Sequence, residues 1–140
     1  MDERITSPVD ALPEVVWALF VDFERWPELT KSIEGIRRLD PGPLSLGSEA
    51  LIKQPRLPEA RWKVTALEPG RSFEWQTSSR GVTTVGGHIV EAEGPGALVT
   101  LTLCQHGPLA WLAKLVAGRL AREYLSLELE GFRHGAEDRS

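Results

Sequence analysis

The sequence predicts an α+β domain in which a curved antiparallel sheet packs against one long C-terminal helix. Three observations support this fold class. Hydrophobic residues repeat with a helical period near both ends of the chain, and with a period of two between them. Proline and glycine cluster between segments of six to twelve residues, the spacing of hairpin-connected strands. A half-apolar sheet and an amphipathic helix can bury these faces against each other.

The composition indicates a single domain over residues 1–140, because this length lies near the common domain size. Of the residues, 41% are hydrophobic and 26% are charged, which is typical of a globular chain. The net charge of −4 argues against a nucleic-acid partner, since phosphate binding needs a basic surface. Cys104 is the one cysteine, and His88, His106 and His134 lack ligand spacing, so we expect no disulfide, metal or cofactor.

The chain shows no targeting or membrane-spanning signal. Residues 1–4 lack the basic segment and apolar run of a signal peptide. The most apolar helical stretch, 109–116, contains Lys114 and is too short to cross a bilayer. We therefore expect a cytoplasmic protein without an integral membrane segment, either a monomer or a homodimer.

A first helix is predicted to begin near Pro13, because proline suits the first helical position. Its apolar stripe consists of Val15, Val16, Leu19, Phe20 and Phe23. Pro27 is expected to end this helix at a turn over residues 25–27, and a short helical turn is expected over 28–32.

Alternating strands follow, and their apolar faces predict which side chains point inward. The predicted inward residues are Ala50, Ile52 and Gln54; Trp62, Val64 and Ala66; Phe73, Trp75 and Thr77; Thr84, Gly86, His88 and Val90; and Val99, Leu101 and Leu103. The pair Gly86-Gly87 indicates a close approach, either a bulge or a neighbouring side chain such as tryptophan.

The last predicted element is an amphipathic helix from about Pro108 to Phe132, long enough to cross a small sheet. Its predicted buried stripe consists of Leu109, Leu112, Val116, Leu120, Tyr124 and Leu127. Residues 134–140 are expected to form a frayed polar tail.

Several motifs resemble the polyketide cyclase/dehydrase and lipid-transport superfamily. They are Pro13-Glu14-Val15-Val16-Trp17, Asp22-Phe23-Glu24-Arg25-Trp26-Pro27, Leu46-Gly47-Ser48, Lys53-Gln54-Pro55, Trp62-Lys63-Val64 and Gly86-Gly87-His88. The resemblance covers nearly all of the chain. It implies the helix-grip fold shared by START domains and the birch-pollen allergen: six or seven antiparallel strands around the C-terminal helix, with one or two short N-terminal helices. It also implies a cavity between helix and sheet for an apolar or aromatic small molecule.

Candidate cavity residues follow from the predicted inward faces and from the resemblance. Trp62 and Trp75 lie on adjacent strands, where they could line a cavity or form plain core. Trp26 and Trp111 are candidates for its mouth. The remaining candidates are Gln54, Val64, Phe73, Thr77, Leu112 and Val116. His88 is a candidate ligand contact and the only candidate for proton transfer, although it could also be a hydrogen-bonded core histidine.

Three functions remain open at this point. The first is binding of a small hydrophobic or aromatic molecule, such as a lipid or polyketide. The second is a cyclase or dehydratase in which His88, assisted by Gln54 or Thr77, transfers a proton while the cavity orients the substrate. The cyclases of the family that this sequence resembles tend to use inward Tyr, Arg and Asp residues, which are few here, and Tyr124 is the only tyrosine. The third is a module that binds a protein partner through the outer sheet face or the C-terminal helix.

Overall fold

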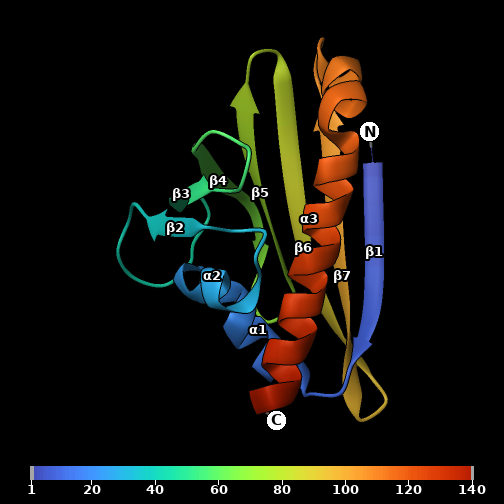
Figure 1. Ribbon diagram of the computed structural model, residues 1–140. Helices are drawn as coiled ribbons and strands as arrows, with labels where there is room; N and C mark the ends of the chain where they lie inside the picture. The colour runs from blue at the N-terminus through green and yellow to red at the C-terminus, as the bar shows by residue number, and fades with distance from the viewer. Residues whose placement is uncertain (1, 140) are drawn as a thin grey trace.

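The structure is a computed structural model that describes residues 2–139 as one seven-stranded antiparallel sheet, a long C-terminal helix and short N-terminal helices (Figure 1). The strands are β1 (Asp2–Val9), β2 (Gly35–Arg38), β3 (Glu49–Lys53), β4 (Ala60–Glu68), β5 (Ser72–Ser79), β6 (Val82–Glu93) and β7 (Gly96–His106). The helices are α1 (Pro13–Val21), the 3-10 turn η1 (Phe23–Arg25), α2 (Trp26–Leu29) and α3 (Ala110–Arg139). This arrangement confirms the predicted fold class.

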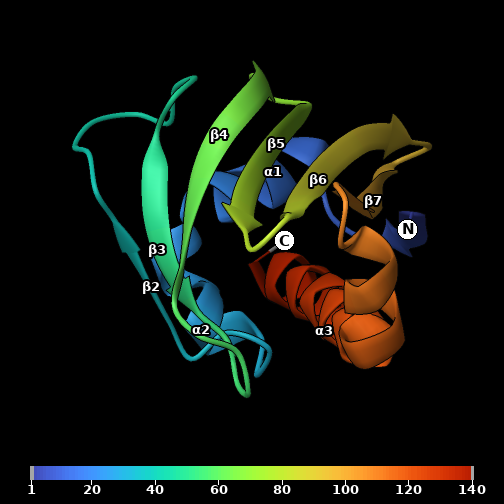
Figure 2. The same cartoon turned by 90° about the horizontal axis from the view of Figure 1, so that it is seen from above.

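The strand order is β1-β7-β6-β5-β4-β3-β2, so the first strand of the chain joins the edge formed by the last. Strand β1 pairs with β7 over its whole length, from Asp2 opposite Cys104 to Val9 opposite Ala97. Figure 2 shows the sheet curving so that its concave side faces α3. The sequence analysis did not predict β1, which lies outside the run of alternating strands on which that prediction rested.

The predicted first helix begins at Pro13 as expected, but its end differs from the prediction. Pro27 lies in the first turn of α2 instead of ending a helix. Proline is tolerated there because the N–H groups of the first turn have no partner within the helix, so the missing N–H costs no hydrogen bond. Helix α2 therefore covers 26–29 and not 28–32. The chain turn falls at Asp22 and η1 instead.

A break in the β4–β5 pairing corrects one predicted inward residue. The register shifts between Val64 and Ala66, which is a β-bulge. Val64 is buried as predicted, whereas Ala66 is exposed and Leu67 packs against the core instead. One extra residue in a strand reverses the faces of those that follow it, and strict alternation cannot reveal that change.

Helix α3 has 30 residues and spans about 45 Å along the sheet, so the predicted end at Phe132 is too early. The expectation of a frayed tail is wrong for residues 134–139, because Gly135 and Ala136 are buried against the rest of the fold. Ser140 lies outside the described residues. The side chain of Leu29 lies within 2.8 Å of the position that a Cβ on Gly135 would occupy, so the absence of a side chain there allows close packing with α2.

The core lies where α1, α2 and the second half of α3 meet the concave face of the sheet. Its centre is a group of mutually contacting aromatic rings: Phe20, Phe23, Trp26, Phe73, Trp75 and Phe132. Phe20 and Phe73 have no exposed surface, and Phe132 has 1%. This end of the molecule is filled by large side chains, and the cavity described below lies beside it, along the middle of α3. No helix of the described chain is long and apolar enough to span a membrane.

Candidate functional site

A cavity of about 270 Å³ lies between the sheet and the middle of α3, beside the aromatic core. Strands β3 to β7 supply one wall, and α3 supplies the other. The helix residues on the cavity are Ala117, Leu120, Ala121, Tyr124, Leu125 and Glu128. Their spacing of three and four residues places them on one face of the helix. Since two of these residues are alanines, this part of the helix leaves space that larger side chains would occupy.

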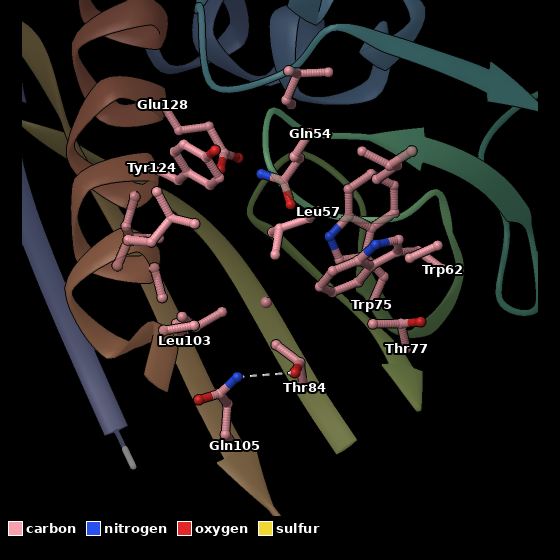
Figure 3. Close-up of a pocket in the computed structure, with 18 of the residues that line it drawn as sticks. Gln54, Leu57, Trp62, Trp75, Thr77, Thr84, Leu103, Gln105, Tyr124 and Glu128 are labelled. Carbon is pink, nitrogen blue, oxygen red and sulfur yellow. Dashed lines mark hydrogen bonds between the residues drawn. The ribbon is translucent and has the colours of Figure 1, made fainter. Parts of the chain in front are cut away.

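Two tryptophans form the aromatic part of the sheet wall. The ring centroids of Trp62 and Trp75 lie 5.7 Å apart, on the neighbouring strands β4 and β5. Figure 3 shows both indoles across the cavity from Tyr124 and Glu128. A Cβ on Gly86 would lie 3.4 Å from Nε1 of Trp75, so this glycine leaves the indole room beside β6. The close approach predicted at Gly86-Gly87 is therefore explained by a tryptophan.

His88 stands at the boundary between the filled core and the cavity. Its ring stacks on Phe73 with a centroid distance of 4.3 Å and an interplanar angle of 5°. It also contacts the edges of Phe20 and Phe132. The side chain of His88 is 4% exposed, so water has little access to the imidazole. An aromatic cage therefore fixes the orientation of the ring.

Glu128 is the polar partner of His88, and the sequence analysis did not identify it. His88 Nε2 lies 3.4 Å from Glu128 Oε1, and the glutamate side chain is 14% exposed. An ionised Glu128 accepts a hydrogen bond from this ring nitrogen. Among the described residues, the buried His88 Nδ1 has no hydrogen-bond partner. Buried polar atoms ordinarily have a hydrogen-bond partner, so this nitrogen is an unsatisfied polar atom beside the cavity.

The loop 54–59 between β3 and β4 borders the opposite side of the cavity and is held at two points. Tyr124 Oη donates a hydrogen bond to the carbonyl oxygen of Pro55, which joins this loop to α3. Lys53 Nζ donates to the carbonyl oxygens of Gln54 at 2.7 Å and Leu57 at 2.6 Å. The side chains of Gln54 and Leu57 line the cavity (Figure 3). The hydrogen bond from Tyr124 therefore connects the two walls.

The structure places six of the eleven predicted ligand contacts on the cavity: Trp26, Gln54, Trp62, Trp75, Thr77 and His88. Two others, Val64 and Phe73, are buried in the core, at 2% and 0% exposure, and do not line it. Trp26 is 1% exposed and belongs to the core, so it does not lie at the mouth of the cavity as predicted. Its Nε1 donates to the carbonyl oxygen of Leu19 at 2.9 Å, so the backbone anchors this indole.

The other three predicted contacts, Trp111, Leu112 and Val116, point to solvent with 63%, 41% and 79% of their surface exposed. The predicted apolar stripe of α3 is right for Leu120 and Tyr124, which line the cavity, and wrong for Leu109, Leu112, Val116 and Leu127, which are exposed. The cavity uses the adjacent face, where small alanines give a weak hydrophobic signal and Glu128 gives a polar one. Glu128 follows Tyr124 by four residues and Leu120 by eight, so all three lie on one face of the helix, and this spacing could have identified Glu128.

Other polar groups are spread along the cavity wall. Gln105 Nε2 donates to Thr84 Oγ1 at 3.3 Å, between β7 and β6 (Figure 3). Thr77 and Thr102 add hydroxyl groups. Among residues 2–139, no three His, Cys, Asp or Glu side chains gather closely enough to hold a metal ion. The arrangement offers a mostly apolar cavity with a few fixed hydrogen-bonding groups, the usual composition of a small-molecule site.

The fold and this cavity define the class of protein: a helix-grip protein with a ligand-binding fold. A family model described as polyketide cyclase/dehydrase and lipid transport matches residues 4–137. The chain therefore belongs to that family, which confirms the resemblance seen in the sequence. A comparison with curated proteins finds no match.

Several solved structures share this fold at low sequence identity. A hypothetical protein of Helicobacter pylori superposes with a TM-score of 0.79 at 12% identity, over 96% of this chain and 86% of that one. The di-domain aromatase/cyclase StfQ of the steffimycin biosynthetic pathway gives 0.80 at 12% identity, over 99% of this chain and 51% of that one. Major latex-like protein 151 of Panax ginseng superposes with a TM-score of 0.68 at 14% identity, over 95% of this chain and 97% of that one. At these identities the comparisons show the fold alone.

Proposed function

We propose that this protein binds a small, largely apolar, aromatic molecule in the cavity between the sheet and α3. The observation that supports this best is the pairing of an indole wall, Trp62 and Trp75, with the buried pair His88 and Glu128. Aromatic walls bind flat apolar rings over a large area, and isolated polar groups fix their orientation. A cavity of about 270 Å³ lies near the lower end of the size range of ligand sites.

The chemistry of the ligand follows from where the polar groups lie. The expected ligand stacks or packs a flat ring system against the two indoles and carries a carbonyl or hydroxyl group. That polar group bonds to the His88–Glu128 pair at the end of the cavity next to the aromatic core. Aromatic polyketides, flavonoids and quinones have this combination, whereas a long saturated fatty acid lacks the flat ring system.

A fluorescence titration tests this proposal. Trp62 and Trp75 border the cavity, so a bound ring system changes the tryptophan emission. We expect a saturable change with micromolar affinity for at least one aromatic class in a panel of quinones, flavonoids, aromatic polyketides and fatty acids. Absence of a saturable response to every class, from a protein that circular dichroism shows to be folded, contradicts the proposal.

A matched pair of variants assigns the binding to the cavity. Ala121→Leu places a larger side chain inside the cavity without removing any contact, and we expect it to weaken binding by about ten-fold or more, because a filled site excludes the ligand. Ser126→Leu puts the same side chain on the exposed face of the same helix and is expected to bind normally. Equal effects of the two variants would place the ligand elsewhere.

The His88–Glu128 pair also favours a second candidate function, an enzyme that transfers a proton within a bound molecule. Here His88 accepts a proton, and Glu128 stabilises the resulting imidazolium while the cavity orients the substrate. The variants His88→Gln and Glu128→Gln separate the two functions. A binding protein keeps an unaltered ligand and changes only in affinity, whereas an enzyme keeps its affinity and loses product formation, measured by chromatography of the ligand after incubation.

A further inference from the structure

The first turns of α3 carry a concentrated patch of exposed apolar side chains. Among the described residues, nine large hydrophobic side chains are exposed, and five of them fall within eight positions of the chain. We call this group the α3 patch; it consists of Leu109, Trp111, Leu112, Leu115 and Val116. Leu115 and Val116 are 76% and 79% exposed, whereas leucines and valines elsewhere in the chain are buried in the core. A clustered patch of this kind marks a surface that binds something.

The α3 patch is held in place by the neighbouring hairpin. The backbone N–H of Leu109 donates to the carbonyl oxygen of Gly81 at 3.1 Å, in the turn between β5 and β6. Figure 1 shows that turn and the start of α3 side by side at one end of the molecule. The patch is therefore a feature of a fixed surface that also includes Arg80 at the tip of the hairpin.

The segments that carry the α3 patch and the neighbouring hairpin contain basic residues but no acidic ones. The chain has 20 acidic residues and a net charge of −4, yet none of its acids falls between positions 94 and 122 or between 75 and 90. Lys114, Arg119 and Arg122 lie in the first of these segments, and Arg80 in the second. Arg122 pairs with Glu3 at 3.3 Å, whereas Lys114, Arg119 and Arg80 form no ion pair with the described residues. An acidic protein thus presents a basic rim at this end.

The spacing of these residues is that of an interfacial helix. Arg119 follows Leu115 by four residues, so it continues the exposed apolar face by one turn. Long cationic side chains beside apolar ones can extend toward lipid headgroups while the apolar residues enter the acyl boundary. Tryptophan, here Trp111, favours the same depth of a bilayer.

We infer that the α3 patch is a docking surface for an anionic lipid bilayer. The basic rim complements anionic headgroups, and the apolar side chains insert between them. A symmetric dimer through this face is disfavoured, because it would place the cationic rims of the two copies against each other. The inference does not depend on an occupied cavity.

Docking in this orientation brings the cavity next to the membrane surface. The α3 residues that follow the patch, Ala117, Leu120 and Ala121, line the cavity, and so do Thr84 and Gln105 at the ends of β6 and β7 near this end of the molecule. If the proposed ligand binding holds, an apolar molecule can pass between bilayer and cavity with little exposure to water. The surface thus gives the proposed site a source or a destination for its ligand.

Vesicle flotation tests the inference with the ligand-free protein. We expect it to float with vesicles of phosphatidylcholine mixed with phosphatidylglycerol, to bind pure phosphatidylcholine vesicles much more weakly, and to dissociate as salt is raised. The double variant Trp111→Ser/Leu115→Ser should reduce bound protein by about ten-fold or more. Leu46→Ser, at a side chain that is 65% exposed on another surface, is the control and should bind like the wild type.

A charge-reversed variant tests the electrostatic part. Lys114→Glu/Arg119→Glu is expected to lose binding by about ten-fold, while Lys31→Glu/Arg37→Glu makes the same change in net charge on exposed residues elsewhere and should lose much less. Three results would overturn the inference: no flotation of folded wild type with anionic vesicles, equal losses in the patch and control variants, or a wild-type dimer in ultracentrifugation that Leu115→Ser converts to monomer. Because no ligand is added, failure here leaves the proposed function untouched.

Discussion

The space between the sheet and α3 is bordered by the same elements at both ends, but the side chains fill it only at one end. At the end near α1 and α2, α3 contributes Leu129 to the hydrophobic core and Phe132 to the set of contacting rings. At the other end it contributes Ala117 and Ala121, and a cavity remains. Small side chains on one helix face create the space that large ones fill farther along. The fold can therefore carry its stability at one end and a ligand site at the other.

His88 lies where these two ends meet. One face of its ring belongs to the filled end, where it stacks on Phe73, and its Nε2 belongs to the hollow end, where it contacts Glu128. The rigid aromatic packing thus supports a polar group of the candidate site. A site that lies on a well-packed core keeps its geometry without using binding energy to order its side chains.

The largest expected effect is the loss of a ring from the filled end. Phe132→Ala removes a 1%-exposed side chain that contacts Phe20 and Trp26, and we expect it to lower the free energy of unfolding by about 3–5 kcal/mol. Leu120→Ala, on a residue that borders the cavity, should cost less than about 2 kcal/mol, because its surroundings are already incompletely packed. Urea denaturation measures both, and equal losses would contradict a division into filled and hollow ends.

A second prediction concerns how tightly α3 approaches α2 at the filled end. A Cβ on Gly131 would lie 2.5 Å from the carbonyl oxygen of Leu29, so Gly131→Ala must displace backbone. We expect a loss of about 1–3 kcal/mol in thermal or urea unfolding, despite a gain of about 1 kcal/mol in helix propensity. Gly135→Ala meets only the ends of side chains, the nearest being Leu29 at 2.8 Å, and should cost less. The reverse ranking would show that the contact of Gly131 with α2 is loose.

Most of the fold could be predicted from the sequence because it depends on periodicity. Alternation placed Ile52, Trp75 and His88 on the inward face, where the structure has them. Strand β1 was not predicted, because its partner is β7, nearly a hundred residues away, and pairing over that distance leaves no local signal. The exposed position of Ala66 was missed for a related reason, since a bulge depends on the register with the neighbouring strand.

The sheet side of the candidate site was predicted better than its helix side. Because side chains alternate between the two faces of a strand, their order in the sequence identifies the strand residues that face the cavity, such as Trp62 and Thr77. On a helix, the side with the largest apolar residues is ordinarily taken as buried, and here the start of α3 exposes exactly those residues while alanines line the cavity. An exposed apolar surface therefore resembles a core face in sequence, and only the three-dimensional packing separates the two.

The smallest expected effect lies at the edge of the sheet, away from both ends of the space between the sheet and α3. Asp40 Oδ1 accepts a hydrogen bond from the backbone N–H of Glu49 at 2.7 Å and closes the connection between β2 and β3. This hydrogen bond, with smaller contributions from Ser48 and Arg38, lowers the pKa of Asp40 below its usual value of 3.8. The ionised carboxylate is therefore favoured in the folded protein, so its contribution to stability is complete above that value and is lost as the pH falls through the lowered pKa.

Because the Asp40 side chain is 37% exposed, solvent reduces this contribution to about 0.5 kcal/mol. Asp40→Asn should lower the free energy of unfolding by that amount at pH 7 and by less at pH 3, in urea titrations at the two pH values. A loss at Asp40 that grows as the pH falls would contradict the assigned role of the carboxylate.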